Sequence, residues 1–396
     1  MKYTIKRNYI KEKNYVFLFA WSIYVISYIF LSQSDVQLLV PRSGTVLKLC
    51  ELLSISVILL KIVVMDKTIN KKTIPMLSVL IISAVSALIS DSYHIFIVIA
   101  FAYGLKDIDI RRFIKLNCFL KIILIAAIVG LCMIGVLDNY VIIAGGVIKS
   151  AVGFYHPNIL GAIVVSVLIE LLYLYFEKNF FLLGTVFFVT LYILSEVCAS
   201  RSSLIGAVLV FALFALLKLF PKLSINNKLL KTAILWLVPI CMALSFFAAI
   251  MYNAYDPTWL RLNDILTNRI KWGSIYVKQF GMPLLGQKVN FIGTRSASIN
   301  STSSMILDNS YLKIGVVYGS IILILFCLGY CIFIRHLLRN NNYKLILLVV
   351  YYVILGLGEN YLYLPAYNIT LILMAASFCG YYIDHSPSEV PQSDES

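Results

Sequence analysis

Residues 159–176 read ILGAIVVSVLIELLYLYF, and Glu170 is the one charged residue among them. As an α-helix, a run of this length spans the roughly 30 Å of hydrocarbon in a bilayer. Similar apolar runs occur before and after it, for example at 15–32 and 233–252. Their repetition along the chain predicts a protein that crosses a membrane several times.

The composition agrees with this prediction. The 396 residues are 61% hydrophobic and 13% charged, with a mean hydropathy of +0.89, whereas an average soluble domain carries about 25% charged residues. We therefore predict an all-α polytopic membrane protein with about 12 transmembrane helices and a long external loop between helices 9 and 10. The expected helices lie near 15–32, 45–64, 74–90, 93–105, 114–136, 157–176, 179–196, 202–220, 231–252, 310–334, 343–358 and 362–383.

The predicted organisation has four parts. These are membrane helices 1 to 9 over 1–252, a large extracytoplasmic loop over 253–309, membrane helices 10 to 12 over 310–383, and a cytoplasmic tail over 384–396. If the N-terminus lies inside, most of the 33 Lys and Arg residues fall in the segments on that same side of the membrane. The positive-inside rule therefore predicts that both termini are cytoplasmic. The absence of alternating apolar-polar strands predicts a location in the inner or plasma membrane. The net charge of +14 follows from this bias, so we expect no nucleic-acid partner.

Polar residues gather at the outward starts of four predicted helices, at 156–158, 200–203, 308–311 and 359–361. Free N–H groups and the positive end of the helix dipole favour anions at such starts. Arg201 lies between two apolar helices, and an ionisable residue at that kind of position is a functional candidate. Helix capping is the alternative interpretation for Ser200, Asn158 and Asp308, and an ordinary interfacial histidine is the alternative for His156.

The external loop has more basic than acidic residues, although the positive-inside rule disfavours positive charge there. This excess favours a cationic surface that meets an anionic head group over a merely solvated loop. Within and beside the loop, several short segments share their order, spacing and predicted sidedness. They are Gly153–Asn158, Ser200–Leu204, Asn268–Trp272, Pro283–Gly286 and Leu307–Leu312, the last followed by Gly315 and Gly319.

Taken together, these segments resemble the O-antigen polymerase and ligase family. The resemblance covers about 153–320, and it implies glycosyl transfer outside the membrane from an oligosaccharide linked to undecaprenyl pyrophosphate. Polymerases of this family pass the growing chain to the next lipid-linked unit, and ligases pass it to another acceptor. Ligases typically carry His where this sequence has Asp308, which favours a polymerase for capsule, exopolysaccharide or O-antigen. The implied partners are the lipid-linked oligosaccharide and the bilayer, with a chain-length regulator and a flippase as further candidates.

The chemistry of this transfer requires cations. Displacing a pyrophosphate from an anomeric carbon leaves negative charge on the leaving group, which cations stabilise. The arginine fork binds phosphate oxygens at two points and stays charged. We assign Arg201 and Arg269 to the pyrophosphate, with Arg261 and Arg295 as weaker candidates.

The acceptor hydroxyl also requires a base, because its own pKa is far above neutrality. Asp308, His156 and Glu359 are the available groups, and Asp308 is preferred over His156. Aromatic rings of the loop could stack on sugar faces, although interfacial aromatics are common in any membrane protein. The candidate substrate contacts are Asn158, Trp272, Asn309 and Tyr311.

The sequence allows two other interpretations of its function. Asp107-Ile108-Asp109 matches the Asp-x-Asp signature of metal-dependent sugar transferases, but it lies on the predicted cytoplasmic side among basic residues, as a solvated loop would. With no phosphate-binding glycine loop and no His/Cys metal spacing, we expect no metal and no cofactor. A secondary transporter or lipid-linked sugar flippase is the alternative from another class. A midplane position of Arg201 and Asp308 would favour that transporter.

Overall fold

The computed structural model describes residues 2–66, 74–144, 146–220, 228–293, 295 and 306–377. Within these ranges the chain is helical apart from one two-stranded hairpin. The first half contains α1 (Lys2–Ser32), α2 (Val36–Leu39), α3 (Ser43–Leu60), η1 (Lys61–Asp66), α4 (Ile74–Ser90), α5 (His94–Tyr103), α6 (Ile110–Met133), β1 (Val141–Ala144), β2 (Val147–Ser150), α7 (Pro157–Tyr175) and α8 (Phe180–Val197). The second half contains α9 (Arg201–Leu219), α10 (Lys228–Leu235), α11 (Leu237–Met251), α12 (Pro257–Ile265), α13 (Arg269–Phe280), α15 (Ser310–Lys313), η2 (Ile314–Tyr318), α16 (Ser320–Arg339), α17 (Tyr343–Leu355), η3 (Asn360–Tyr363) and α18 (Thr370–Ser377).

Six helices of the described chain are long and apolar enough to cross a membrane, within α1 and in α6, α7, α8, α9 and α16. A seventh span results if α10 and α11, which meet at a bend of 50°, are counted together. The all-α membrane class is therefore supported. The predicted count of twelve is not confirmed, because α4, α5 and α17 are shorter than a span requires and the expected helix over 362–383 is broken.

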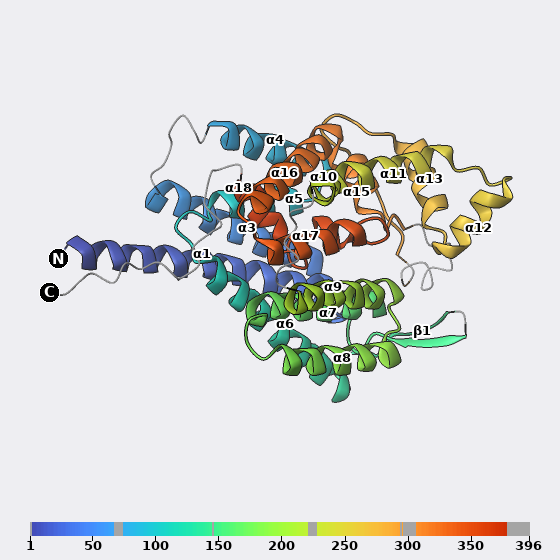
Figure 1. Ribbon diagram of the computed structural model, residues 1–396, viewed down its shortest axis with the longest axis horizontal. Helices are drawn as coiled ribbons and strands as arrows, with labels where there is room; N and C mark the ends of the chain where they lie inside the picture. The colour runs from blue at the N-terminus through green and yellow to red at the C-terminus, as the bar shows by residue number, and fades with distance from the viewer. Residues whose placement is uncertain are drawn as a thin grey trace.

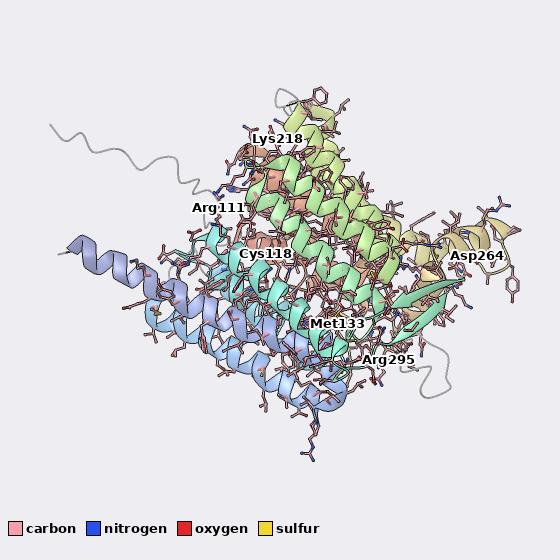
Figure 2. All side chains as sticks on the ribbon, turned by 90° about the horizontal axis from the view of Figure 1, so that it is seen from below. Arg111, Cys118, Met133, Lys218, Asp264 and Arg295 are labelled. Atoms are coloured by element: carbon pink, nitrogen blue, oxygen red, sulfur yellow. The ribbon has the colours of Figure 1, made fainter. Side chains whose placement is uncertain are left out.

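The helices pack into one bundle whose two ends differ (Figure 1). The hairpin, α12 and α13 lie at the end opposite to the start of α1. Figure 2 shows Arg111 and Lys218 toward the N-terminal end, and Asp264 and Arg295 at the opposite end. The sequence predicted that these two pairs lie on opposite sides of the membrane, and they do lie at opposite ends of the bundle. Which end is cytoplasmic stays a prediction.

The expected helix over 310–334 is broken into α15, η2 and α16. The break lies at Gly319, which has a φ of 95°. The Pro283–Gly286 segment packs against it: a Cβ on Gly319 would lie 2.5 Å from the nitrogen of Gly286. The nitrogen of Ser320 donates to the Pro283 carbonyl across 2.8 Å. Two segments that the sequence analysis grouped by order alone are therefore in backbone contact.

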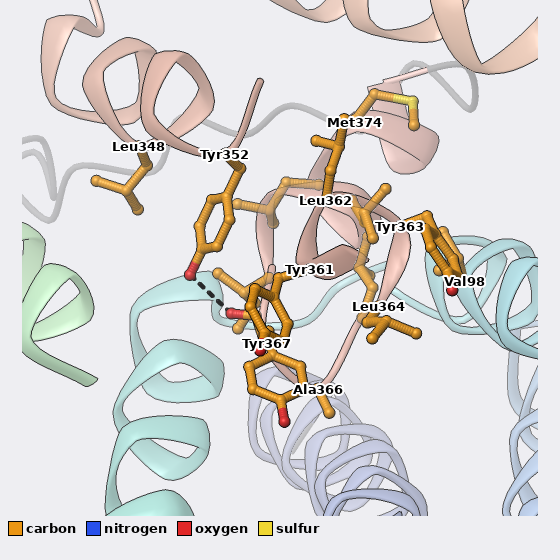
Figure 3. Close-up of a cluster of buried hydrophobic side chains, with 14 of the residues drawn as sticks. Val98, Leu348, Tyr352, Tyr361, Leu362, Tyr363, Leu364, Ala366, Tyr367 and Met374 are labelled. Atoms are coloured by element: carbon orange, nitrogen blue, oxygen red, sulfur yellow. Dashed lines mark hydrogen bonds between the residues drawn. The ribbon is translucent and has the colours of Figure 1, made fainter. Parts of the chain in front are cut away.

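The expected helix over 362–383 is also replaced, since its first part forms η3 and turns before α18 begins at Thr370. Pro365 explains the difference, because proline lacks an N–H donor and disfavours helical conformation in the residue before it. The buried Asn368 side chain donates to the Leu362 carbonyl and accepts from the Thr370 nitrogen. Figure 3 shows the tyrosines of this segment inside the core, where the Tyr352 hydroxyl donates to the Tyr367 carbonyl across 2.7 Å. Residues 378–383 lie outside the described chain, as does the predicted tail over 384–396.

Two segments predicted as external loops contain regular structure. The segment between α6 and α7 forms the antiparallel hairpin β1–β2, with Val141 paired to Ser150. The predicted loop over 253–309 contains α12 and α13 before its irregular part. Helix α13 packs against α11, which also contacts α15, so the loop is attached to the bundle near the start of α15.

Candidate functional site

Three of the four predicted polar helix starts meet at the beginning of α7. His156 caps α7, because its Nδ1 accepts the Asn158 backbone N–H across 3.1 Å. The Asn158 carbonyl in turn accepts the Tyr361 hydroxyl across 3.2 Å. A Cβ on Gly161 would lie 2.7 Å from the Cβ of Ser200, so the start of α9 lies directly against α7. These contacts bring the starts of α7 and α9 and the η3 segment together.

A cluster of one arginine and two carboxylates lies at the same place. Arg269 Nη2 donates to Glu359 Oε1 across 2.6 Å, and its Nε lies 3.9 Å from Asp308 Oδ2. Asn360 Nδ2 donates to Asp308 Oδ1 across 3.3 Å. Asp308 therefore lies beside a guanidinium. The catalytic role of Asp308 stays a prediction.

Local structure positions Arg269 at the first turn of α13. Asn268, just before the helix, is in the left-handed region with a φ of 64°, a conformation that asparagine tolerates better than most residues. The Asn263 side chain holds this turn by donating to Asn268 Oδ1 and accepting the Lys271 N–H. Gly358 allows the guanidinium to approach, since a Cβ there would lie 2.9 Å from Arg269 Nη1.

Glu359 is held from several sides. Ser202 Oγ donates to its Oε1 across 2.5 Å, and Ser310 Oγ donates to its backbone carbonyl across 2.5 Å. The Glu359 side chain is 4% exposed, whereas those of Arg269 and Asp308 are 21% and 30% exposed. Asp308 is therefore the carboxylate that a substrate can reach, and Glu359 is a buried counter-charge that fixes Arg269.

Burial dominates the electrostatics of both acids. It raises the pKa of Asp308, and the nearby Arg269 and Lys313 partly oppose that rise. It also raises the pKa of Glu359; Arg269 opposes this rise, while the negative charge of Asp308 adds to it. Two carboxylates share one guanidinium, so the charge of Arg269 is already compensated. A pyrophosphate at this cluster would need further cations.

Arg201, the other predicted pyrophosphate ligand, lies at the first position of α9 and is exposed. In the described part of the chain no carboxylate lies within 4 Å of it. Its neighbour Ser202 bonds to Glu359. Arg201 therefore lies beside the cluster with its charge free for an anion.

The weaker arginine candidates lie elsewhere. Arg261 is exposed on α12. Arg295 is buried, forms an ion pair with Asp35, and lies 4.5 and 5.2 Å from the ring centres of Tyr140 and Tyr155. Because its charge is paired and its faces are covered by rings, Arg295 is better placed to anchor the external segment than to bind pyrophosphate.

Two predicted substrate contacts are part of the core. The Tyr311 ring is fully buried and its hydroxyl donates to the Val353 carbonyl across 2.7 Å, so no sugar can stack on it. Asn309 caps α15 by accepting the Leu312 N–H, and it donates to Ser245 and to the Leu357 carbonyl. Trp272 is half-buried beneath Lys271, whose Nζ lies 5.7 Å from a ring centre. His156 is capping its helix, and burial lowers its pKa to about 4, which makes it a weak base.

No group of three or more His, Cys, Asp or Glu that could hold a metal occurs within the described residues. The Asp-x-Asp triplet has structural partners: Asp107 pairs with Lys13 across 2.9 Å, and Asp109 caps α6 by accepting the Arg112 N–H. The expected absence of a metal stays a prediction.

Three further residues belong to the cluster, although the sequence patterns assigned them no role of their own. Ser202, Gly358 and Asn360 each contact Arg269, Glu359 or Asp308. They are neighbours in sequence of Arg201 or Glu359, so their position beside these candidate residues was the sequence feature that could have identified them.

Comparison with family models, curated proteins and solved structures gave no match to this chain. The class of protein that the fold supports is thus an all-α membrane protein with a carboxylate–arginine cluster at one end of its bundle.

Proposed function

We propose that this chain is a glycosyltransferase of the polysaccharide polymerase type. It joins oligosaccharide repeat units linked to undecaprenyl pyrophosphate on the outer face of the cytoplasmic membrane, for capsule, exopolysaccharide or O-antigen. The observation that carries the proposal is the partly exposed Asp308 beside Arg269, with Glu359 behind it, at the convergence of the polar helix starts. An accessible base beside cations at a membrane end is what such a transfer requires.

In the proposed reaction, a hydroxyl of the acceptor sugar attacks the anomeric carbon of the donor. The new glycosidic C–O bond forms as the bond from that carbon to the pyrophosphate oxygen breaks, and undecaprenyl pyrophosphate leaves with the electron pair. Asp308 takes the hydroxyl proton. Arg269 keeps Asp308 ionised, because a nearby positive charge favours the carboxylate form.

The leaving group is assigned to Arg201 and the first turn of α9. Arg201 has no acid within 4 Å among the described residues, and the free N–H groups of its helix start point to the same end of the bundle. A bidentate guanidinium and a helix dipole both favour a pyrophosphate. Arg269, whose charge is shared by two carboxylates, is secondary in this role.

The product of cells that lack the protein tests the proposal. A polymerase defect should leave single repeat units on the carrier or at the surface and abolish long chains, and the wild-type gene should restore them while a gene encoding Asp308→Asn should not. Full-length chains that remain on undecaprenyl pyrophosphate and fail only to reach another acceptor would indicate a ligase. Lipid-linked units that accumulate on the cytoplasmic leaflet would overturn the proposal in favour of a flippase.

One observation favours transport as a second candidate. Lys121 and Glu170 form an ion pair of 2.8 Å that is almost completely buried between α6 and α7, and Glu170 Oε2 has no hydrogen-bond partner. Ionisable groups inside a membrane bundle commonly mark an ion or substrate path. Asp308, however, precedes α15, and Arg201 is the first residue of α9. Both positions lie at one end of the bundle, where a transferase site is expected.

A further inference from the structure

Lys313 is the last residue of α15 and follows Asp308 in the same polar motif. Its Nζ lies 4.4 Å from the ring centre of Phe291 and 6.0 Å from that of Tyr363. The residue is half-buried. Within the described part of the chain it makes no ion pair, and no hydrogen bond to its Nζ is present.

The lack of a carboxylate oxygen within 4 Å, among the described residues, sets Lys313 apart from the deeply buried lysines. Lys13, Lys61 and Lys121 each have a carboxylate oxygen within 3.0 Å. That pattern is expected, because removing an ammonium group from water is costly unless an opposite charge compensates it. Aromatic faces supply only a small part of that compensation.

The surroundings of Lys313 contain a second group without a partner. The Tyr363 ring lies 6.4 Å from the ring of His94 and 5.9 Å from that of Tyr318, measured between ring centres. His94 Nδ1 is buried and makes no hydrogen bond. A cation, an unpaired imidazole nitrogen and aromatic faces therefore lie together, next to the Asp308 cluster but on different elements from Arg201.

We propose that Lys313, with His94 and Tyr363, forms a second subsite that binds an anionic group of the substrate. That group is the pyrophosphate of a lipid-linked unit or the carboxylate of an acidic sugar. The inference rests on the proposed function for its choice of ligand. A polymerase holds two lipid-linked units at once, so it must accommodate two pyrophosphates, and the Arg269 cluster with its two carboxylates cannot neutralise both.

Binding to the full-length protein in lipid nanodiscs tests this subsite without requiring turnover. The probes are farnesyl diphosphate and methyl glucuronide, with uncharged farnesol to report apolar binding. We expect Lys313→Gln to weaken binding of one charged probe about tenfold or more, since a hydrogen bond to a charged group contributes about 1.5–3 kcal/mol. Loss for farnesyl diphosphate assigns the subsite to the lipid carrier, and loss for methyl glucuronide assigns it to an acidic sugar.

Two matched variants control the measurement. Lys313→Arg retains the charge and should keep most of the affinity. Lys288→Gln removes an exposed lysine, 3.2 Å from Asp91, and should change affinity by less than about twofold. Unchanged binding of both charged probes by a folded Lys313→Gln protein would overturn the proposal, and so would an equal loss for farnesol, which would show that Lys313 only packs.

The outcome is separable from that of the proposed function. If Lys313 binds a charged probe but cells lacking the protein still make long polysaccharide, the polymerase assignment fails and the subsite stands. If Asp308→Asn abolishes chain growth while Lys313→Gln binds both probes normally, the polymerase stands and the subsite fails.

Discussion

Asp308 and Glu359 flank the same guanidinium but are suited to different tasks. Glu359 accepts hydrogen bonds from Arg269 and Ser202 and is nearly inaccessible, so its carboxylate is already committed. Asp308 accepts one long hydrogen bond from Asn360 and remains partly exposed. A base must be able to contact the proton it removes. At the level of single residues, these contacts favour Asp308 over Glu359.

The pH dependence of chain growth should report this base. Burial raises the pKa of Asp308 and Arg269 opposes that rise, so activity should be lost as pH falls through a value above the ordinary range of aspartate, about 3.9. Arg269→Gln removes the opposing charge and should move this acid limb to higher pH. The measurement is the pH profile of kcat/KM for the purified protein with a lipid-linked repeat unit.

Lys271→Gln provides the control for this shift, because it removes a positive charge from the exposed side of the same helix. An acid limb that Arg269→Gln leaves in place, or that both variants move equally, would contradict the role of Asp308 as the base beside Arg269.

Arg201 tests the geometry of anion binding. Arg201→Lys keeps the charge but loses the planar fork, so we expect a severe fall in activity, on the order of tenfold or more, with normal accumulation in the membrane. Arg261→Lys, on exposed α12, should leave activity almost unchanged. Chain growth that is normal in Arg201→Lys would show that this residue only anchors its helix.

At the scale of elements, the contact between Gly319 and the Pro283–Gly286 segment fixes where α16 begins. Gly319→Ala would place a Cβ 2.5 Å from two backbone atoms at a positive φ, so we expect a loss of at least about 1 kcal/mol in the free energy of unfolding. Gly44→Ala is the control: Gly44 lies in α3 with no atom within 4 Å of the added Cβ. That change should be neutral or stabilise by up to about 1 kcal/mol.

Thermal unfolding in detergent measures both variants. A Gly319→Ala protein as stable as the wild type would mean that the 283–286 segment can move away from α16 at little cost.

Much of the element order follows from hydropathy alone, because long apolar runs have few other stable arrangements. The errors have local causes. Pro365 ends the helical continuation that the apolar residues after 362 suggested, and Gly319 interrupts an apolar run that looked continuous. Helices α12 and α13 carry too many polar residues for hydropathy to detect them. Their existence depends on local signals such as Asp256 and Pro257 at a helix start.

The candidate site was predictable in part for the same reason. Sidedness placed the helix starts at one end, and the structure brings them together. Sequence order carries no information on which carboxylate lies next to which arginine, so the Arg295–Asp35 pair and the link from Ser202 to Glu359 could not be foreseen. Tyr311 was misread because an aromatic residue at a helix start can face either the core or the substrate.

Across the described part of the molecule, buried ion pairs lie at both ends of the bundle and, at Lys121 and Glu170, between them. At the N-terminal end, Lys13 and Lys61 share Asp66, and Lys13 also pairs with Asp107. The opposite end holds the Arg269 cluster. Between them, Lys121 donates to Glu170, to Ser166 Oγ and to the Tyr367 carbonyl, so this pair joins α6, α7 and the segment before α18.

The central pair distinguishes a structural tie from an ion path. Removing one partner of a buried ion pair costs about 3–5 kcal/mol, whereas replacing both with uncharged side chains of similar size is often neutral or stabilising. We therefore expect Lys121→Met and Glu170→Gln each to lower the unfolding temperature, and the double variant to recover most of that loss.

If the protein is a transferase whose site lies at the end of the bundle, the double variant should also recover chain growth on purified lipid-linked units. A transporter that moves protons or substrate past Glu170 would instead stay inactive in the double variant despite its restored stability, because the titratable group itself is gone. Chain growth that persists with the pair removed, measured beside an inactive Asp308→Asn protein, would leave the Arg269 cluster as the site of chemistry.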